Sequence, residues 1–293
     1  MFTSLQAAVA AAETEGKPLG QLALETEARD QGRPVAEIRE ALRRALAVMR
    51  GAVEQGLVGD LRSASGLVGG DAAKVKASTA GPFAGNVFSD VLARALAVQE
   101  VNAAMGVIVA APTAGGAGVL PAVLTGLATA HGFPDEQVID ALATAGLIGA
   151  VVADRASLSG AEGGCQAETG AAAAMAAGAA TEMLGGSPRQ VSHAVALAQQ
   201  GTLGLVCDPL GGLVELPCVF RNATGSAIAL AAVEMALAGV EFAIPADEVI
   251  DTMGEIGAAM DVRYRETAGG GLAATPTGRR LARERLVQIK RGP

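Results

Sequence analysis

Residues 35–57 read VAEIREALRRALAVMRGAVEQGL, and their apolar side chains recur every three or four positions. On a helix this spacing gathers the apolar side chains on one face, which predicts that the face is buried. The residues of this face are Ile38, Leu42, Ala45, Met49 and Val53. Pro34 stands where a helix favourably begins, and Gly51 and Gly56 weaken its end. Residues 1–60 are therefore predicted to form two or three amphipathic helices that serve packing rather than chemistry.

Comparable patterns continue along the chain. Helices are predicted over Val87–Ala104, from Pro121 onward, and over Glu136–Ala153, Ala171–Leu184, Pro188–Gln199 and Ala223–Ala238. Residues 107–110 could be a short strand or the end of a buried helix, because periodicity does not separate the two. Strand alternation never persists for more than a few residues. The predicted fold is all-α, that is, mainly helical with glycine-rich functional loops and at most a few short strands.

The composition indicates how the core must pack and which partners are not expected. The apolar half of the chain is mostly Ala, Val and Leu, with no Trp and one Tyr, so small side chains must pack closely. The net charge of −8 argues against nucleic acid, which requires a basic surface. The basic run of residues 279–291 is interpreted as a solvated helix face.

A membrane location is also not expected. Residues 101–134 carry no charged side chain and are long enough to span a bilayer. However, Asn102, Pro112 and Pro121 interrupt this stretch, and lipid could not satisfy such an irregular backbone. We interpret it as buried core. The N-terminus lacks the basic start and cleavage site of a signal peptide, so a cytoplasmic protein is predicted.

The three cysteines are Cys165, Cys207 and Cys218, and none belongs to a CxxC pair. This excludes a zinc ribbon or a thioredoxin motif, and three cysteines are too few for a disulfide framework. Free cysteines are most often small buried hydrophobes, which is one interpretation of all three.

The neighbouring residues favour a second interpretation. The cysteines occur in GGCQAE (163–168), in CDPLGG (207–212) and after Pro217. Iron-binding thiolates need such places, where the backbone can approach and donate hydrogen bonds to sulfur. A four-iron cluster usually takes four cysteines, so with three thiolates one iron keeps an open position. An open metal site suits a Lewis acid, and dehydration of a hydroxylated substrate is the natural chemistry of this arrangement.

The chain resembles the iron–sulfur-dependent L-serine dehydratases from about residue 40 onward. The motifs that carry the resemblance are Gly69-Gly-Asp71 with Lys74, EVNAAMG (100–106), PTAG (112–115), GGCQAE (163–168), GLVCDP (204–209), Pro217-Cys218 with Arg221-Asn222, and GGLAATPTG (270–278). The resemblance implies a [4Fe–4S] cluster on Cys165, Cys207 and Cys218. It also implies conversion of L-serine to pyruvate and ammonia without pyridoxal phosphate. The chain is similar to the α subunit alone, which implies a β subunit as partner and allows a homo-oligomer.

One domain over residues 1–293 is the simplest organisation. In it, residues 1–60 are packing helices, residues 61–278 are the cluster and substrate core, and residues 279–293 are a basic C-terminal tail.

The identity of the general base stays open. His131 and His193 lie outside the motifs and are expected at helix surfaces or ends. The base is then the alkoxide of Ser65 or a group of the β partner. Lys74 could pair with the substrate carboxylate, or it is an exposed lysine beside an Asp. Arg221 is suited to a bidentate grip on a carboxylate, although a structural salt bridge would also explain it.

Further residues are candidates to line a substrate pocket, with loop capping and turn chemistry as the alternative for each. They are Asn102, Thr113, Gly115, Glu168 and Asn222. Three rival functions remain: a lyase of the same class acting on threonine or cysteine, a non-catalytic iron–sulfur sensor subunit, and a helical scaffold with inert cysteines.

Overall fold

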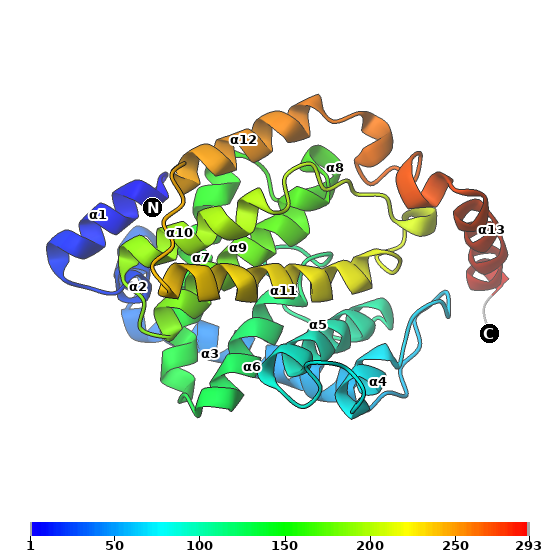
Figure 1. The fold of residues 1–293 in the computed structure, drawn as a ribbon, viewed down its shortest axis with the longest axis horizontal. Helices are drawn as coiled ribbons and strands as arrows, with labels where there is room; N and C mark the ends of the chain where they lie inside the picture. Colours follow the sequence, from blue (N-terminus) through cyan, green and yellow to red (C-terminus); the bar gives the residue numbers. More distant parts are fainter. Residues whose placement is uncertain (1, 292–293) are drawn as a thin grey trace.

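The computed structural model describes residues 2–291, and the side chains as far as residue 285. In this part of the chain the regular structure is helical, and Figure 1 shows how the helices are arranged. The α-helices are α1 (Leu5–Glu15), α2 (Leu19–Gln31), α3 (Val35–Leu57), α4 (Asp71–Ala77), α5 (Val87–Ala103), α6 (Val119–His131), α7 (Asp135–Arg155), α8 (Gly160–Gly163), α9 (Ala171–Met183), α10 (Pro188–Gln200), α11 (Cys218–Leu237), α12 (Ala246–Ala259) and α13 (Pro276–Arg291). The predicted fold class is confirmed.

Helix α9 lies at the centre of the molecule and packs against α6, α7, α10 and α11. Its sequence is mostly alanine, and nearly all of its residues are buried. A Cβ atom on Gly178 would overlap the side chains of Ile148 on α7 and Val195 on α10. The scarcity of large side chains in the sequence thus appears in the structure as close helix packing.

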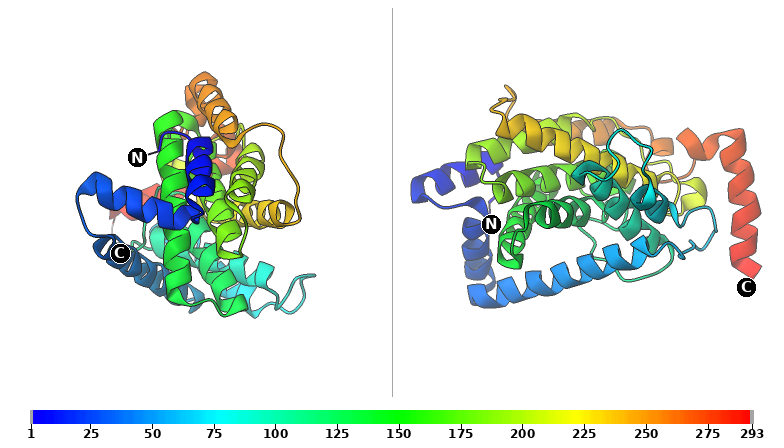
Figure 2. Two further views of the ribbon diagram at one scale, coloured as in Figure 1. Left: turned by 90° about the vertical axis from the view of Figure 1, so that its left-hand side faces the viewer. Right: turned by 60° about the horizontal axis from the view of Figure 1, so that its bottom comes forward.

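The two ends of the chain lie at opposite ends of the molecule. Helices α1 and α2 cover one end, and α13 projects from the other (Figures 1 and 2). Helix α3 has the predicted bounds, and its buried residues include Ile38, Met49 and Val53. Periodicity therefore identified this helix and its buried face correctly.

Several segments differ from prediction. Helix α11 begins at Cys218 rather than Ala223. Residues 107–110 form neither strand nor helix, because Met105 takes a left-handed conformation (φ 63°) that ends α5 and Pro112 disfavours helical geometry just before it. Helices α4, α8 and α12 are additions to the predicted set.

Helix α7 is long and apolar enough to cross a membrane by length and composition alone. Of its most apolar stretch, 67% is buried inside the protein, where α7 packs against α9 and α2. The uncharged stretch of residues 101–134 includes α6, and most of α6 is likewise buried. Both helices belong to the core.

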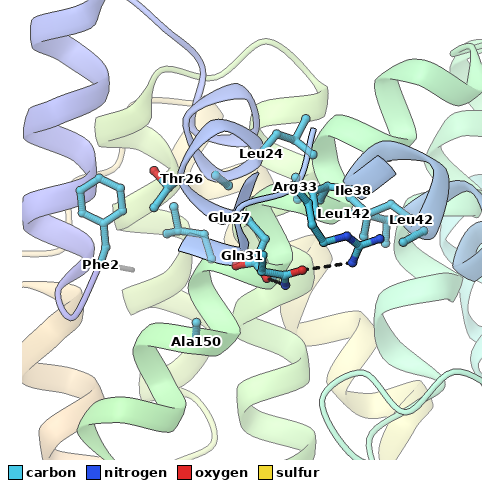
Figure 3. A pocket seen from close by; sticks show the side chains of 15 residues that line it. Phe2, Leu24, Thr26, Glu27, Gln31, Arg33, Ile38, Leu42, Leu142 and Ala150 are labelled. Carbon is cyan, nitrogen blue, oxygen red and sulfur yellow. Dashed lines mark hydrogen bonds between the residues drawn. The ribbon is translucent and has the colours of Figure 1, made fainter. Parts of the chain in front are cut away.

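An apolar cavity of about 350 Å³ lies between α2, α3 and α7 (Figure 3). Leu24, Ile38 and Leu142 line its wall, and Glu27 and Arg33 lie at its polar edge. None of the cysteines lines this cavity.

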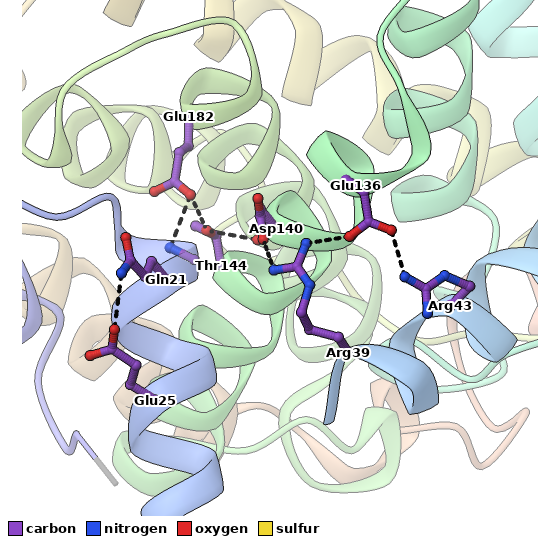
Figure 4. Close-up of polar contacts among 9 residues, drawn as sticks. Gln21, Glu25, Arg39, Arg43, Glu136, Asp140, Thr144 and Glu182 are labelled. Carbon is purple, nitrogen blue, oxygen red and sulfur yellow. Dashed lines mark hydrogen bonds and ion pairs between the residues drawn. The ribbon is translucent and has the colours of Figure 1, made fainter. Parts of the chain in front are cut away.

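Beside it, the half-buried carboxylate of Glu182 fixes the start of α2. Glu182 accepts hydrogen bonds from the backbone N–H groups of Leu19 (2.7 Å) and Gly20 (2.9 Å) and from Thr144 Oγ1 (2.7 Å). Figure 4 shows this contact next to the ion pairs of Arg39 with Glu136 and Asp140. The carboxylate satisfies N–H groups that the first turn of a helix leaves unpaired.

Two glycines of α3 allow the effect of close packing on stability to be measured apart from the effect of helix propensity. A Cβ atom on Gly56 would overlap the backbone of Ala97 in α5, whereas a Cβ atom on Gly51 would meet nothing within 4 Å. We expect Gly56→Ala to lower the free energy of unfolding by about 1–3 kcal/mol through overpacking. Gly51→Ala is expected to raise it by about 0.5–1 kcal/mol. Urea unfolding of both variants checks this, and equal effects would contradict the α3–α5 contact.

Burial raises the pKa of Glu182, with Thr144 and the two backbone N–H groups opposing the shift. The native protein therefore holds this proton at pH values where the unfolded chain has released it, so stability falls as pH rises above about 4.5. We expect Glu182→Gln to flatten that fall, by no more than about 1.4 kcal/mol per pH unit. Glu25→Gln is the control, since Lys17 lowers the pKa of Glu25 and the sign is opposite. Urea unfolding between pH 4 and 7 measures both; parallel wild-type and Glu182→Gln curves would contradict the expectation.

Candidate functional site

The three cysteines come from three separate places in the chain and meet inside the protein. Cys165 immediately precedes the π-helical turn η1 (Gln166–Gly170), Cys207 follows α10, and Cys218 is the first residue of α11. Their exposed fractions are 2%, 1% and 5%. Cys165 and Cys207 lie close enough for each to shift the pKa of the other, and the charge of Cys165 acts on Cys218. The structure thus brings together the three predicted ligands.

The thiols do not titrate alike. The neighbouring Cys207 thiol, with Thr169 and the charge of Arg221, lowers the pKa of Cys165 to about 7 against the opposing effect of burial. The same closeness of the two thiols, together with burial, raises the pKa of Cys207, since a second thiolate would form beside the first. Burial raises the pKa of Cys218 to about 12. One thiolate is therefore favoured near neutral pH and the other two are disfavoured, unless a positive group binds there.

Arg221 is held by an ion pair with Asp208, at 2.8 Å between Nη2 and Oδ1. Its Nη1 donates to the carbonyl of Val206 at 2.8 Å. Burial opposes the charge, but the charges of Cys165 and Asp208 raise the pKa of Arg221. The guanidinium thus forms a structural salt bridge, which was the alternative explanation for Arg221. Its charge still acts on the thiols.

Asp208 also binds the glycine-rich segment of residues 270–278 near the C-terminus. Its Oδ2 accepts from the backbone N–H of Leu272 at 2.6 Å, and a Cβ atom on Gly271 would overlap the carboxylate. The sequence interpretation did not select Asp208, although it directly follows Cys207 in one of the quoted motifs.

Glu168 lies against Cys207 and is 9% exposed. Thr113 Oγ1 donates to its Oε1 at 2.7 Å, and Cys207 Sγ lies 3.9 Å from Oε2 as a weak donor. A Cβ atom on Gly115 or on Gly160 would come within 3 Å of the same carboxylate. Burial raises the pKa of Glu168. The structure thus groups Thr113, Gly115 and Glu168, as predicted for one pocket, beside a cysteine.

Asn222 is fully buried and clamps the glycine turn of residues 112–118 to α11. Its Oδ1 accepts from the N–H of Gly118 (2.9 Å), and its Nδ2 donates to the carbonyls of Gly115 (2.7 Å) and Cys218 (2.9 Å). Asn102 Nδ2 donates to the carbonyl of Ala114 in the same turn at 3.3 Å. Both amides hold the turn, which is the capping alternative for these residues.

A further loop covers the site from the C-terminal side. The backbone N–H of Cys207 donates to Tyr264, and that of Glu266 donates to the carbonyl of Cys207, both at 2.8 Å. Glu266 has a left-handed conformation (φ 63°), and its charge raises the pKa of Glu168. Such strain persists only where surrounding structure enforces it, often at functional sites.

Ser65 is 4% exposed and contacts Glu215, which is equally buried. Ser65 Oγ donates to Oε2 of Glu215, and the backbone N–H of Ser65 donates to Oε1 at 3.1 Å. Sequence reasoning missed Glu215; the only signal was a charged residue in an apolar run just before Cys218.

The structure leaves Lys74 and the histidines apart from these residues. Lys74 is exposed and pairs with Asp71 (Nζ to Oδ1, 2.7 Å), as its alternative interpretation states. His131 ends α6 at the surface, and His193 lies on α10, where its Nδ1 accepts from Phe242.

Among the described residues, no three His, Cys, Asp or Glu side chains are grouped to hold a single metal ion. The polar groups around the three thiols include the carboxylates of Glu168 and Asp208 and the guanidinium of Arg221.

This arrangement belongs to a known class of protein. The family model described as "Serine dehydratase alpha chain" matches residues 14–273. The chain belongs to this family, and the resemblance recognised in the motifs is confirmed.

Similar proteins carry the same description. A probable L-serine dehydratase alpha chain of Bacillus subtilis is 52% identical over 82% of this chain and 80% of its own length. The L-serine dehydratase alpha chain of Peptoniphilus asaccharolyticus is 40% identical over 93% and 94%. In Escherichia coli, L-serine dehydratase TdcG is 46% identical over 64% of this chain, but only 42% of that longer protein is covered.

The clamp by Asn222 predicts a stability effect. Asn222→Ala removes three buried hydrogen bonds and leaves the N–H of Gly118 unpaired, so we expect the free energy of unfolding to fall by about 2–4 kcal/mol. Thr224→Ala, at an exposed position of the same helix, is the control and should change it by less than about 0.5 kcal/mol. Urea unfolding measures both. An Asn222→Ala variant as stable as the control would show that the clamp contributes nothing.

Proposed function

We propose that this chain is a catalytic α chain that converts L-serine to pyruvate and ammonia together with a β companion chain. Family membership and the relatives described as L-serine dehydratase alpha chains support this. The observation that carries the proposal is the meeting of three buried cysteines, from three glycine-rich or proline-rich motifs, beside Glu168 and Arg221.

The donor set fits a [4Fe–4S] cluster held by Cys165, Cys207 and Cys218. Two of the three thiols are poor thiolates without a positive partner, and iron supplies that charge. Gly160 and Gly164 leave no room for a side chain beside Cys207 and the Cys165 turn. When bound, such a cluster supplies a Lewis acid that makes the substrate hydroxyl a better leaving group.

The residues of the chain itself bind and orient the substrate in this proposal. Thr113 and the backbone of the glycine turn provide hydrogen-bonding groups, and Glu168 forms the wall next to Cys207. Asn102, Gly115 and Asn222 fix the turn, while Arg221 supplies positive charge. Ser65 removes the α-proton. Lys74, in its exposed pair with Asp71, receives no role in this mechanism.

The companion chain is supported by the lengths of the relatives. The Streptomyces coelicolor L-serine dehydratase matches this chain over only 53% of its own length, so it carries additional sequence outside the matched part. A cytoplasmic location and a homo-oligomeric state stay predictions.

The test is an anaerobic reconstitution of the chain with iron and sulfide, with a β chain added. We expect about four irons per chain, a visible absorption band, and pyruvate from L-serine. Cys165→Ser, Cys207→Ser and Cys218→Ser should each lose iron and activity, while His131→Ala, at a helix end, should keep both. Colourless wild-type protein would contradict the cluster.

The same preparation distinguishes the rival functions. Faster turnover of threonine or cysteine than of L-serine would favour a related lyase. A complete cluster without turnover of any of the three amino acids would favour an iron–sulfur sensor.

A further inference from the structure

Glu215 and Ser65 form a buried pair whose members are far apart in the sequence. The carboxylate of Glu215 binds Ser65 with both oxygens. Oε1 accepts a hydrogen bond from the backbone N–H of Ser65, and Oε2 accepts one from its hydroxyl group. Each residue is 4% exposed. The pair joins two motif regions of the chain, so it links the loop of residues 61–70 to the start of α11.

The main chain holds Glu215 rigidly. Its N–H donates to the carbonyl of Leu213 (2.8 Å), its carbonyl accepts from the N–H of Val219 (2.9 Å), and the next residue, Leu216, accepts from Leu210 (2.8 Å). Glu215 thus lies just before the first residue of α11. Cys218 begins the same helix, so the position of Glu215 is coupled to that of a cysteine.

The loop that carries Ser65 is held equally firmly. Ser63 donates to the carbonyl of Val68 (3.0 Å), and Ala64 donates to that of Ala103 at the end of α5 (3.2 Å). Glu100 accepts from the N–H groups of Gly70 and Asp71 at the end of the loop. The hydroxyl of Ser65 therefore has a fixed place relative to α5 and α11.

The hydrogen-bond directions at Ser65 are unambiguous. Its Oγ accepts from the N–H of Leu67 at 3.1 Å and donates to Glu215. One lone pair of Oγ stays free, because a hydroxyl oxygen accepts two hydrogen bonds. The Glu215 carboxylate contacts both the hydroxyl and the backbone N–H of Ser65.

We infer that Glu215 is a positioning residue that takes up the hydroxyl proton of Ser65, so that Ser65 Oγ can accept the α-proton of L-serine. This inference rests on the proposed function. As the Cα–H bond breaks, its electron pair forms the Cα=Cβ bond and the Cβ–O bond breaks. The α-proton forms the new Ser65 O–H bond, and the departing hydroxide with the proton on Glu215 makes up one water. The remaining aminoacrylate is hydrolysed to pyruvate and ammonia.

A purely structural role has a clear counterpart in the same chain. Glu182 also accepts hydrogen bonds from one hydroxyl group, that of Thr144, and from two backbone N–H groups (Figure 4). This contact fixes the start of α2, and no cysteine lies among its partners. Glu182→Gln is therefore a matched control for Glu215→Gln.

The experiment uses the reconstituted holoenzyme with its β chain and compares Glu215→Gln, Ser65→Ala, the double variant and Glu182→Gln. Loss of a general base typically slows a reaction by about 10²–10⁴-fold, and we expect that loss in kcat for Glu215→Gln with little change in KM. The isotope effect with L-serine deuterated at Cα should rise, because proton removal becomes the slowest step. Glu182→Gln should keep wild-type kcat and isotope effect.

The double variant tests whether Glu215 acts through Ser65. If it does, adding Glu215→Gln to Ser65→Ala costs no further activity, whereas independent effects would multiply. Multiplying effects, or a Glu215→Gln enzyme with wild-type kcat and isotope effect, would overturn the inference.

Iron content and circular dichroism of each variant control for folding, and Glu215→Asp keeps a carboxylate if the amide is not tolerated. Partial recovery of kcat in Glu215→Asp supports the inference. If neither variant folds with its iron, Glu215 is a structural clamp and the inference falls.

Exchange of the serine α-proton in D2O, followed by NMR, separates this inference from the proposed function. Exchange by the wild type that both Glu215→Gln and Ser65→Ala abolish supports the pair, even where no pyruvate forms. Pyruvate formation that survives in both variants overturns the pair and the base role of Ser65, and leaves the conversion of L-serine to pyruvate intact.

Discussion

The three hydrogen bonds of Asn222 are the constraint on which the site depends. They set the position of the glycine turn of residues 112–118 relative to α11, and therefore to Cys218. The turn in turn presents Thr113 to Glu168, and Glu168 contacts Cys207. One buried amide thus connects two of the three cysteines through a chain of direct contacts. Because a buried amide without partners costs several kcal/mol, this arrangement is strongly specified.

Small side chains make that arrangement possible. The alanines of α9 let neighbouring helices approach closely, and Gly115 and Gly160 leave space for the Glu168 carboxylate. Close packing makes a protein interior resist deformation. The loops between the helices can therefore be irregular and still hold their side chains at fixed positions, as the cysteine turns require.

Sequence reasoning reached the parts of this structure that depend on local pattern. Helix α3 follows from its apolar spacing, and the cysteines stood out because glycine and proline surround them. Reasoning failed where a contact joins distant segments. Glu215 meets Ser65 across 150 positions, and no local pattern indicates such a pair. The partner of Arg221 was missed for the same reason, and the start of α11 because residues 218–222 show no helical spacing.

The buried carboxylates of Glu168 and Glu215 have different surroundings in the site. Arg221 is engaged by Asp208 and acts on the thiols, so neither Glu168 nor Glu215 is neutralised by it. Burial and the charge of Glu266 raise the pKa of Glu168, whereas the contacts with Thr113 and Cys207 lower it. Glu215 instead binds the hydroxyl and the backbone N–H of Ser65. In the inferred mechanism Glu215 therefore takes up the proton that the departing hydroxide later needs, while Glu168 forms the wall beside Cys207.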